Sequence, residues 1–511
     1  MNEIMLNGED LKIETLWKFC RNALDPKAHI RIKIDPKVEK RVLAAEKFVH
    51  ELANSGETVY GMNTGFGYFA KTRIRHDQIE ELQHNIIRSH ACGVGEELPR
   101  DLVLMLWIIL LNSVCRGHRG LALSKLKAIA KMLEAGILAC VPARGSVGAS
   151  GDLAPTAHAV LAILGEGECT ALKGNDFARM KASEALKKAG IKPVKLGPKE
   201  GLCLINGTQL TAALAVTLWH EARQLLDTAN LATAMSVEAL RGSHHMMDEA
   251  LLREQRQQGT LACGRAIAGW IGGETAISKS HVDCGRVQDS YSLRCAPQVH
   301  GMVWDELEQT KVIIEREINA TTDNPLLFPD RKLVIHGGNF HAIYPARVCD
   351  RLGAALTTLA TISERRVNTA MRTEKSGLPT FLIENGGLNS GFMMIQVTAA
   401  ALASECKSLS FPASVDSIPT NNDQEDHVSM GPGAGLKALE IAGKVRYVLA
   451  IELLVAAQAL DMLKPLKTSK KLETIKAAIR KRVPYMKKDR ILAPDIEAVH
   501  GLVETGELVG S

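Results

Sequence analysis

Residues 145–155 read Gly-Ser-Val-Gly-Ala-Ser-Gly-Asp-Leu-Ala-Pro. This stretch is the most informative part of the chain about its fold and its chemistry. Its glycines reach backbone dihedral angles that are closed to other residues, so the chain can turn sharply here. In a compressed turn the amide nitrogen of Gly151 can approach the carbonyl carbon of Ala149. Ring closure, with loss of water from the ring and from the Ser150 side chain, would leave a methylidene-imidazolone. This ring carries an electrophilic alkene.

A glycine-rich turn before a helix also has more ordinary interpretations. It can be a simple turn, or an anion site at the N-terminus of the helix. Gly145, Gly148 and Gly151 also loosely match a dinucleotide-binding loop, but the surrounding sequence lacks the βαβ pattern that such a loop requires. Ala149-Ser150-Gly151 alone favours a simple turn. A choice between the turn and the electrophile therefore depends on other parts of the sequence.

Seven other sequence motifs favour the electrophile over a simple turn. They are YGMNTGFG at 60–67, LINGTQ at 204–209, QDSYSLRC at 288–295, NATTDNP at 319–325, GGNFH at 337–341, SIPT at 417–420 and EDHVSMG at 425–431. Together with 145–155, and in this order, they resemble the aromatic amino-acid ammonia-lyase and aminomutase family. The resemblance implies that Ala149, Ser150 and Gly151 form 4-methylidene-imidazol-5-one (MIO), with no external cofactor. It also implies that this electrophile adds the substrate amine or, in an older proposal, attacks the aromatic ring.

The resemblance assigns the general base to a tyrosine. Tyr60 lies in the block that closes over the substrate in the family, and Tyr291 is a second candidate. A tyrosine needs a lowered pKa or an alkaline medium to act as a base, because its usual pKa is about 10. The sequence leaves the choice between the two open.

Substrate-binding residues follow from the same blocks. Arg294 is the natural partner of the substrate carboxylate, because its planar guanidinium donates paired, charge-assisted hydrogen bonds. By similarity, Asn206 and Gln288 hold the oxygen of the electrophile or the substrate carboxylate. Phe340 is expected to line the pocket beside the electrophile.

Two positions indicate which amino acid is the substrate. Ser89-His90 matches the histidine-selective members, the histidine ammonia-lyases, and His90 can form a hydrogen bond with an imidazole. Glu405 matches a glutamate of those enzymes, and the apolar residues at 397–402 predict that it is buried, where a carboxylate needs a partner. We therefore expect L-histidine as substrate and trans-urocanate and ammonia as products.

A few positions depart from the commonest pattern of the family. Ser290 replaces a frequent proline and Cys92 a frequent alanine, and residues 421–423, Asn-Asn-Asp, are unusual in the late loop. None of them supplies a proposed catalytic group.

The pattern of apolar residues predicts a mainly α-helical protein. Helices are expected at 77–88, 101–115, 154–164, 208–240, 304–318, 344–371, 392–409 and 436–463. The resemblance implies a fumarase/aspartase-like fold, with an N-terminal region (1–207) that bears the electrophile and a central bundle of long helices with the C-terminal region (208–511). It further implies a homotetramer in which each active site draws residues from three chains.

Composition excludes several other classes of protein. The net charge of +5 over 511 residues is small, and the lysine pairs are scattered, so we expect no nucleic-acid partner. The longest strongly apolar stretch, 102–111, is too short to span a membrane and predicts a buried helix. Eleven dispersed cysteines, no Cys-x-x-Cys pair and no secretory signal predict a cytoplasmic protein. His244-His245 lacks a third ligand at metal spacing, so no metal site is expected.

Rival functions remain open. An aminomutase uses the same electrophile and returns the ammonia to the β-carbon, and a tyrosine or phenylalanine ammonia-lyase differs only in substrate. A lyase of the fumarase-aspartase type would carry a Gly-Ser-Ser loop signature, which this sequence lacks. The alternative that is not an enzyme is an inactive scaffold protein. This alternative is disfavoured because predicted catalytic and binding groups are present, namely Ala149-Ser150-Gly151, Tyr60, Tyr291 and Arg294.

Overall fold

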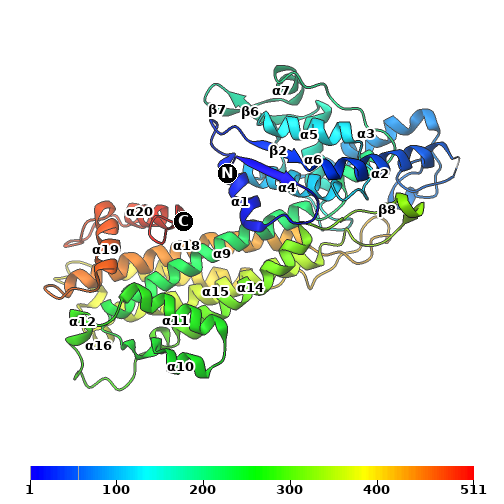
Figure 1. The fold of residues 1–511 in the computed structure, drawn as a ribbon. Coiled ribbons are helices and arrows are strands. Elements are labelled where there is room, and N and C mark those ends of the chain that lie inside the picture. Colours follow the sequence, from blue (N-terminus) through cyan, green and yellow to red (C-terminus); the bar gives the residue numbers. More distant parts are fainter. Residues whose placement is uncertain (1, 56, 511) are drawn as a thin grey trace. The chain divides into compact units, whose positions relative to one another are not determined.

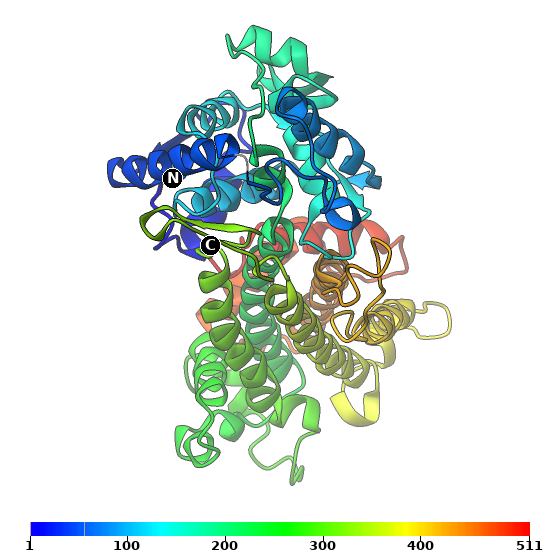
Figure 2. The same ribbon diagram turned by 90° about the vertical axis from the view of Figure 1, so that its right-hand side faces the viewer.

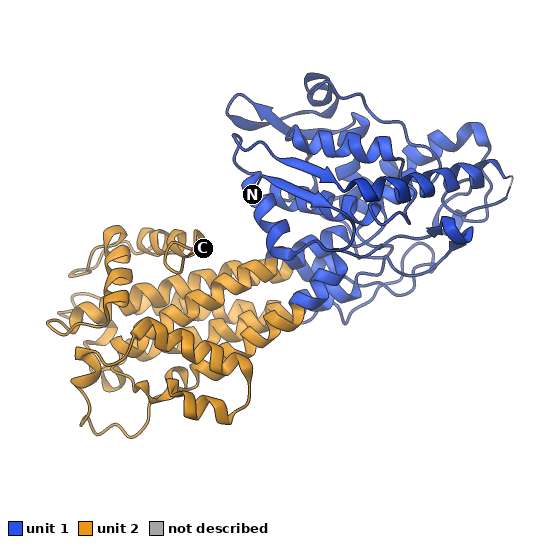
Figure 3. Cartoon of the chain, in the orientation of Figure 1, with its two compact units in different colours: residues 1–217, 311–350, 412–436 blue, residues 218–310, 351–411, 437–511 orange. Residues whose placement is uncertain are grey.

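The structure of the chain is a computed structural model that describes residues 2–55 and 57–510. The chain divides into two compact units, each assembled from three separate segments (Figure 3). Unit 1 comprises residues 1–217, 311–350 and 412–436, and unit 2 comprises residues 218–310, 351–411 and 437–511. The sequence predicted two regions, 1–207 and 208–511, and this division stays a prediction.

Unit 1 combines medium-length helices with short strands (Figure 1). Its complete helices are α1 (Ile13–Asn22), α2 (Pro36–Asn54), α3 (Ile79–His90), α4 (Arg100–Val114), α5 (Leu123–Glu134), α6 (Leu153–Leu164), α7 (Ala182–Lys188) and α8 (Glu200–Ile205), with 3₁₀ helices η1 (Gly67–Phe69), η2 (His76–Gln78) and η4 (Pro329–Arg331). Its strands are β1 (Glu3–Leu6), β2 (Arg31–Ile34), β3 (Val94–Glu97), β4 (Leu138–Ala139), β5 (Pro142–Arg144), β6 (Glu168–Lys173), β7 (Asp176–Lys181), β8 (Leu326–Phe328) and β9 (Leu333–Ile335). β1 and β2 pair in parallel, whereas β3–β5, β4–β6–β7 and β8–β9 are antiparallel.

Helix α4 forms the centre of unit 1. Every residue from Leu102 to Val114 is buried, which explains why the helix is apolar around its whole circumference. The sequence predicted a buried helix here, and the prediction is confirmed. Within the described residues, every helix is too short or too polar to cross a membrane.

Unit 2 is a bundle built on four long helices. These are α9 (Gln209–Ala239), α14 (Ala296–Glu317), α15 (Ile343–Ala370) and α18 (Gly431–Met462), most of whose residues belong to unit 2. The shorter elements are η3 (His244–Met247), α10 (Glu249–Glu254), α11 (Gln258–Ile271), α12 (Ala276–Lys279), α13 (Tyr291–Arg294), α16 (Thr373–Ser376), η5 (Thr380–Leu382), α17 (Met393–Leu409), α19 (Lys470–Arg482) and α20 (Ala493–Glu504). Figures 1 and 2 both show the long helices lying side by side within this unit.

A buried ion pair ties three of these helices together. The guanidinium of Arg366 on α15 binds the carboxylate of Glu452 on α18, with N–O distances of 2.5 and 2.9 Å. The hydroxyls of Ser236 on α9 and Ser363 on α15 donate to the same carboxylate, at 2.7 and 2.6 Å. Both oxygens of Glu452 are therefore satisfied, as a buried charge requires.

The expected mainly helical fold is confirmed, and most predicted helices end within a few residues of the observed ones. The largest difference is at helix α14, which begins at Ala296 rather than at residue 304, and α18 begins at Gly431 rather than at residue 436. For α14, the sequence predicted a later start because Pro297 and Gly301 are residues that usually interrupt a helix. Proline is compatible with the first turn of a helix, and a Cβ atom on Gly301 would overlap the backbone of Thr260, so this glycine allows α14 and α11 to approach closely.

Candidate active site

Ala149, Ser150 and Gly151 lie in a turn directly before α6, beside Gly207. The N–H of Gly207 donates to the carbonyl oxygen of Ser150 at 3.2 Å, and the N–H of Asp152 donates to the carbonyl oxygen of Gly207 at 2.7 Å. Gly151 has a φ of +83°, and a Cβ atom on it would overlap the carbonyl group of Gly207. Only glycine fits this position, and its nitrogen carries no neighbouring side chain that would obstruct an attack on Ala149.

A second segment holds the same turn from the late loop. The N–H of Met430 donates to the carbonyl oxygen of Val147 at 2.9 Å, and the hydroxyl of Ser429 donates to that of Gly148 at 3.3 Å. Residues distant in the sequence thus fix both ends of the predicted ring-forming stretch.

Asp152 anchors the turn to α9. Its carboxylate is fully buried and accepts hydrogen bonds from the N–H and the hydroxyl of Thr211, at 2.7 and 2.8 Å. Burial raises the pKa of Asp152 to about 6, while the hydrogen bonds from Thr211 oppose the shift. The residue after Gly151 therefore cannot move without breaking buried contacts.

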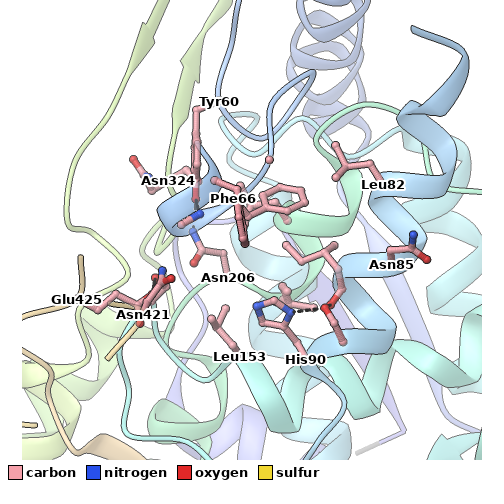
Figure 4. A pocket seen from close by; sticks show the side chains of 18 of the residues that line it. Tyr60, Phe66, Leu82, Asn85, His90, Leu153, Asn206, Asn324, Asn421 and Glu425 are labelled. Atoms are coloured by element: carbon pink, nitrogen blue, oxygen red, sulfur yellow. Dashed lines mark hydrogen bonds between the residues drawn. The ribbon is translucent and has the colours of Figure 1, made fainter. Parts of the chain in front are cut away.

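A cavity of about 630 Å³ is lined by Ser150, and all of its lining residues belong to unit 1. Figure 4 shows this cavity from close by. This volume is in the range of small-molecule sites. The residues that line it include five of the predicted site residues: Tyr60, His90, Ser150, Asn206 and Phe340. Ile86, Leu153, Leu202 and Ile205 supply an apolar wall. The structure thus brings five of the eleven predicted site residues together in one cavity.

Tyr60 reaches the cavity from the loop that precedes η1. Its phenolic oxygen accepts a hydrogen bond from the N–H of Gly67 at 3.2 Å. Burial raises the pKa of Tyr60, and the charges of Glu425 and Asp323 add to the increase, whereas the hydrogen bond from Gly67 lowers it. The net shift is upward, so this tyrosine becomes a phenolate only in an alkaline medium.

His90 ends helix α3 and faces the cavity (Figure 4). Its Nδ1 lies 3.1 Å from the hydroxyl of Ser89. Burial lowers the pKa of His90, which favours the neutral imidazole. A neutral imidazole has one donor and one acceptor nitrogen, and it can pair with another imidazole.

Asn206 lines the cavity, and among the described residues its side-chain amide forms hydrogen bonds through one end only. Its side-chain NH₂ donates to the carboxylate of Asp323 at 3.1 Å and to the carbonyl oxygen of Asn324 at 3.3 Å. Its Oδ1 is buried without a hydrogen-bond partner in the described part of the chain. Asp323 is in turn fixed by Lys199 at 2.6 Å, in an ion pair with no exposed side-chain surface. The open atom suits an N–H of a ligand better than a carboxylate oxygen.

Glu425 is a cavity residue that the sequence analysis did not single out. It lines the cavity and accepts hydrogen bonds from the hydroxyl of Ser150 at 3.1 Å and from that of Thr420 at 2.7 Å. Its position at the start of the EDHVSMG block was the signal that could have identified it. Figure 4 shows Glu425 beside Asn421 at the margin of the cavity.

Comparison with known proteins assigns the chain to a family. A family model described as aromatic amino acid lyase matches residues 11–481.

The chain belongs to the aromatic amino acid lyase family.

The resemblance stated from the motifs is therefore confirmed, and the matched span contains every predicted site residue. The histidine ammonia-lyase of Stigmatella aurantiaca is 44% identical over 506 residues, covering 99% of this chain and 97% of that protein. The histidine ammonia-lyase of Salmonella paratyphi B is 42% identical over 508 residues, covering 99% and 98%. The crystal structure of histidine ammonia-lyase from Trypanosoma cruzi matches with a TM-score of 0.89 at 38% identity, covering 99% of this chain and 94% of that one.

Four of the other predicted residues, Gln288, Tyr291, Arg294 and Glu405, belong to unit 2 and are not among the residues that line the cavity. Gln288 precedes α13, which carries Tyr291 and Arg294. The guanidinium carbon of Arg294 lies 4.6 Å from the ring centre of Tyr291, and the tyrosine side chain is 71% exposed. Tyr291 and Arg294 therefore lie in contact with each other.

Glu405 differs from what the sequence predicted about its surroundings. It lies on α17 with 54% of its side chain exposed, and it pairs with Lys444 at 2.5 Å. The burial expected from residues 397–402 is wrong, because Val397 itself is 47% exposed on the same helix. Glu405 is not among the residues that line the cavity.

His244, one of the adjacent histidines, pairs with Glu238 at 2.8 Å. Across residues 2–55 and 57–510, no group of three histidine, cysteine, aspartate or glutamate side chains is placed to hold a metal ion.

Proposed function

We propose that this protein is a histidine ammonia-lyase, which eliminates ammonia from L-histidine without oxidation and releases trans-urocanate, the first step of histidine degradation. The observation that carries the proposal is the cavity in which His90 and Glu425 both lie beside Ser150. A neutral imidazole and a carboxylate complement the two ring nitrogens of histidine, whereas a phenyl ring would leave both without a partner. The names of the full-length relatives agree with this substrate.

The electrophile MIO is part of the proposal. The bond from the Gly151 nitrogen to the Ala149 carbonyl carbon would form, and two water molecules would leave, one with the former carbonyl oxygen and one with the Ser150 hydroxyl. No oxidant is needed. The left-handed backbone of Gly151 and the close approach of Gly207 support the fit of this ring. Once formed, the ring would supply an electrophilic alkene that could bind the substrate amine and would make the amine a better leaving group.

The chain's own residues then bind the substrate and move its proton. His90 is proposed to bind the imidazole, and the Oδ1 of Asn206 to accept from the amino group. Tyr60 is the base that faces the cavity, and its raised pKa predicts an alkaline pH optimum. Tyr291 stays an alternative base.

Glu425 is the carboxylate that we propose for contact with the substrate ring. It lines the cavity and touches Ser150, and an ionised carboxylate there can accept the imidazole N–H. Glu405, which the sequence favoured for this role, remains a prediction. Its exposure and its pairing with Lys444 weigh against it.

A homotetramer is proposed to complete the site. The cavity lies within unit 1, whereas Gln288, Tyr291 and Arg294 belong to unit 2, and a guanidinium is a strong partner for a substrate carboxylate. Copies of the chain are therefore proposed to supply these residues. The exposed apolar side chains on α17, of which Met394 is 61% exposed, support an interface between copies. The cytoplasm is the proposed location, on the basis of the eleven dispersed cysteines.

The test is ultraviolet detection of product when the purified protein meets histidine, tyrosine and phenylalanine separately. Urocanate from histidine alone is the expected result. Coumarate or cinnamate would keep the family and overturn the substrate. A β-amino acid, detected by chromatography, would identify an aminomutase, and no product of any kind would identify an inactive scaffold.

A further inference from the structure

The late loop contains an uncommon backbone turn. Asn421, Asn422 and Asp423 follow one another with φ values of 51°, 55° and 60°, so three consecutive residues other than glycine are left-handed. This conformation is unfavourable for L-residues, and asparagine and aspartate tolerate it best. The turn is enforced by its flanks, because Thr420 and Glu425 exchange backbone hydrogen bonds at 3.0 and 3.3 Å. Strain held in this way is typical of functional positions.

The turn presents the side chain of Asn421 to the loop that carries Tyr60. A Cβ atom on Gly67 would overlap the side-chain amide of Asn421, so the amide packs directly against the backbone of this glycine. The Oδ1 of Asn421 also accepts a hydrogen bond from the N–H of Tyr68 at 3.4 Å. Gly67 is itself left-handed, with a φ of 55°, and its lack of a side chain is what makes the contact possible.

The contact continues to the phenol. The N–H of Gly67 donates to the oxygen of Tyr60 at 3.2 Å, and this is the hydrogen bond that stabilises a phenolate there. At the other end of the same turn, Glu425 accepts the hydroxyl hydrogen bond of Ser150. One short turn therefore contacts both the loop of the candidate base and the residue that forms the electrophile.

We infer that Asn421 is a positioning residue: its side chain packs against the backbone of Gly67 and holds the N–H of Gly67 in place at the oxygen of Tyr60. It acts through Gly67 and does not itself react. The inference rests on the proposed function insofar as Tyr60 serves as the base.

The direction of the effect follows from the groups that face Tyr60. The carboxylates of Glu425 and Asp323 raise its pKa, as does burial, and the hydrogen bond from Gly67 lowers it. The ring of His336 lies edge to face with the ring of Tyr60, with 6.0 Å between the ring centres. If Asn421 is removed and the Gly67 peptide turns away, the stabilising bond is lost and the pKa of Tyr60 rises further. A base with a higher pKa becomes active only at higher pH.

The experiment compares Asn421→Gly with Asn422→Gly in the full-length protein. Glycine adopts the left-handed backbone freely at both positions, so the turn is kept and only the side chain is lost. Asn422 is the matched control, because it has the same backbone conformation but does not line the cavity. We expect Asn421→Gly to lower kcat for histidine about tenfold and to move the rising limb of the pH profile up by about one unit. The control should match the original protein.

A second readout does not depend on turnover. The phenolate absorbance of Tyr60 is titrated as the difference between each protein and its Tyr60→Phe derivative, and the midpoint should be higher with Asn421→Gly. Equal midpoints for the two asparagine variants, or a lost kcat without a shift of the pH profile, would overturn the inference. If the original protein released no urocanate, the proposed function would fail while the titration still tested Asn421.

Discussion

The buried polar groups of the helical bundle and those of the cavity are organised differently. In unit 2, both carboxylate oxygens of Glu452 are satisfied by Arg366 and two serine hydroxyls. In unit 1, Lys199 and Asp323 form an equally buried pair, but the Oδ1 of Asn206, which binds Asp323 and lines the cavity, has no hydrogen-bond partner among the described residues. A satisfied network specifies the packing of helices, whereas an open atom on a rigid support is available to a ligand.

The two regions also differ in how their backbone is held. The long bundle helices follow the regular spacing of apolar residues along the chain. The cavity depends on irregular contacts, such as Gly151 against Gly207 and Asn421 against Gly67. The stability of the fold therefore depends on regular helices with saturated buried polar groups, whereas the cavity depends on backbone contacts so close that a Cβ atom would not fit.

The largest effect is expected from Ser150→Ala. The variant lacks the hydroxyl that would leave as water, so it should lose more than about a thousandfold of its activity while its helical content is unchanged. Intact-protein mass spectrometry checks the cause independently of activity. The mass of the original chain should be lower by two water molecules, and that of the variant should not show this loss. Retained activity would exclude the self-made electrophile.

A large effect on stability is expected from Arg366→Leu in the bundle. Removal of the cation leaves the buried carboxylate of Glu452 without its main partner, and the free energy of unfolding should fall by about 3–5 kcal/mol. The matched control is Arg253→Leu, because Arg253 pairs with Glu249 at 2.8 Å on the surface of the same unit. This exposed pair should contribute about 0–1 kcal/mol. Urea unfolding measures both, and equal losses would remove the distinction between saturated core and surface.

A smaller effect is expected from Glu425→Gln, tested beside Glu405→Gln. Loss of the carboxylate that faces Ser150 should lower kcat/KM for histidine about a hundredfold. Glu405→Gln removes only a half-exposed partner of Lys444, so its stability should change by less than about 1 kcal/mol. Steady-state kinetics with histidine ranks the two variants. A larger loss at Glu405 would restore the assignment that the sequence favoured.

Much of the fold could be predicted from the sequence because helices leave a local signal. The spacing of apolar residues identified α9, α15, α17 and α18, and the uniformly apolar stretch at 102–111 identified α4. Ser150, Tyr60, His90, Asn206 and Phe340 were found through motifs, and the structure brings them to one cavity.

The remaining features depend on contacts between distant segments. An apolar stretch such as 397–402 shows that a helix face avoids water, but not whether its own chain covers that face, so Glu405 was expected to be buried. Glu425 was overlooked for the complementary reason, since only the fold brings residue 425 to Ser150. The Oδ1 of Asn206, which has no partner among the described residues, could not be predicted either. The fold alone determines that Asp323 accepts a hydrogen bond from the Nδ2 of Asn206 and leaves the Oδ1 unused.

The clamping of residues 147–152 by Gly207 and by residues 429–430 sets an order of events during biosynthesis. The ring-forming turn is complete only after the chain has been made as far as residue 430 and has folded back on itself. On the proposed chemistry, a nascent chain leaves the ribosome without its electrophile, and each ring is formed once, irreversibly, in a correctly folded chain. The fraction of molecules that have lost two waters would then be a permanent record of how many chains folded this half of the protein, readable even after later denaturation.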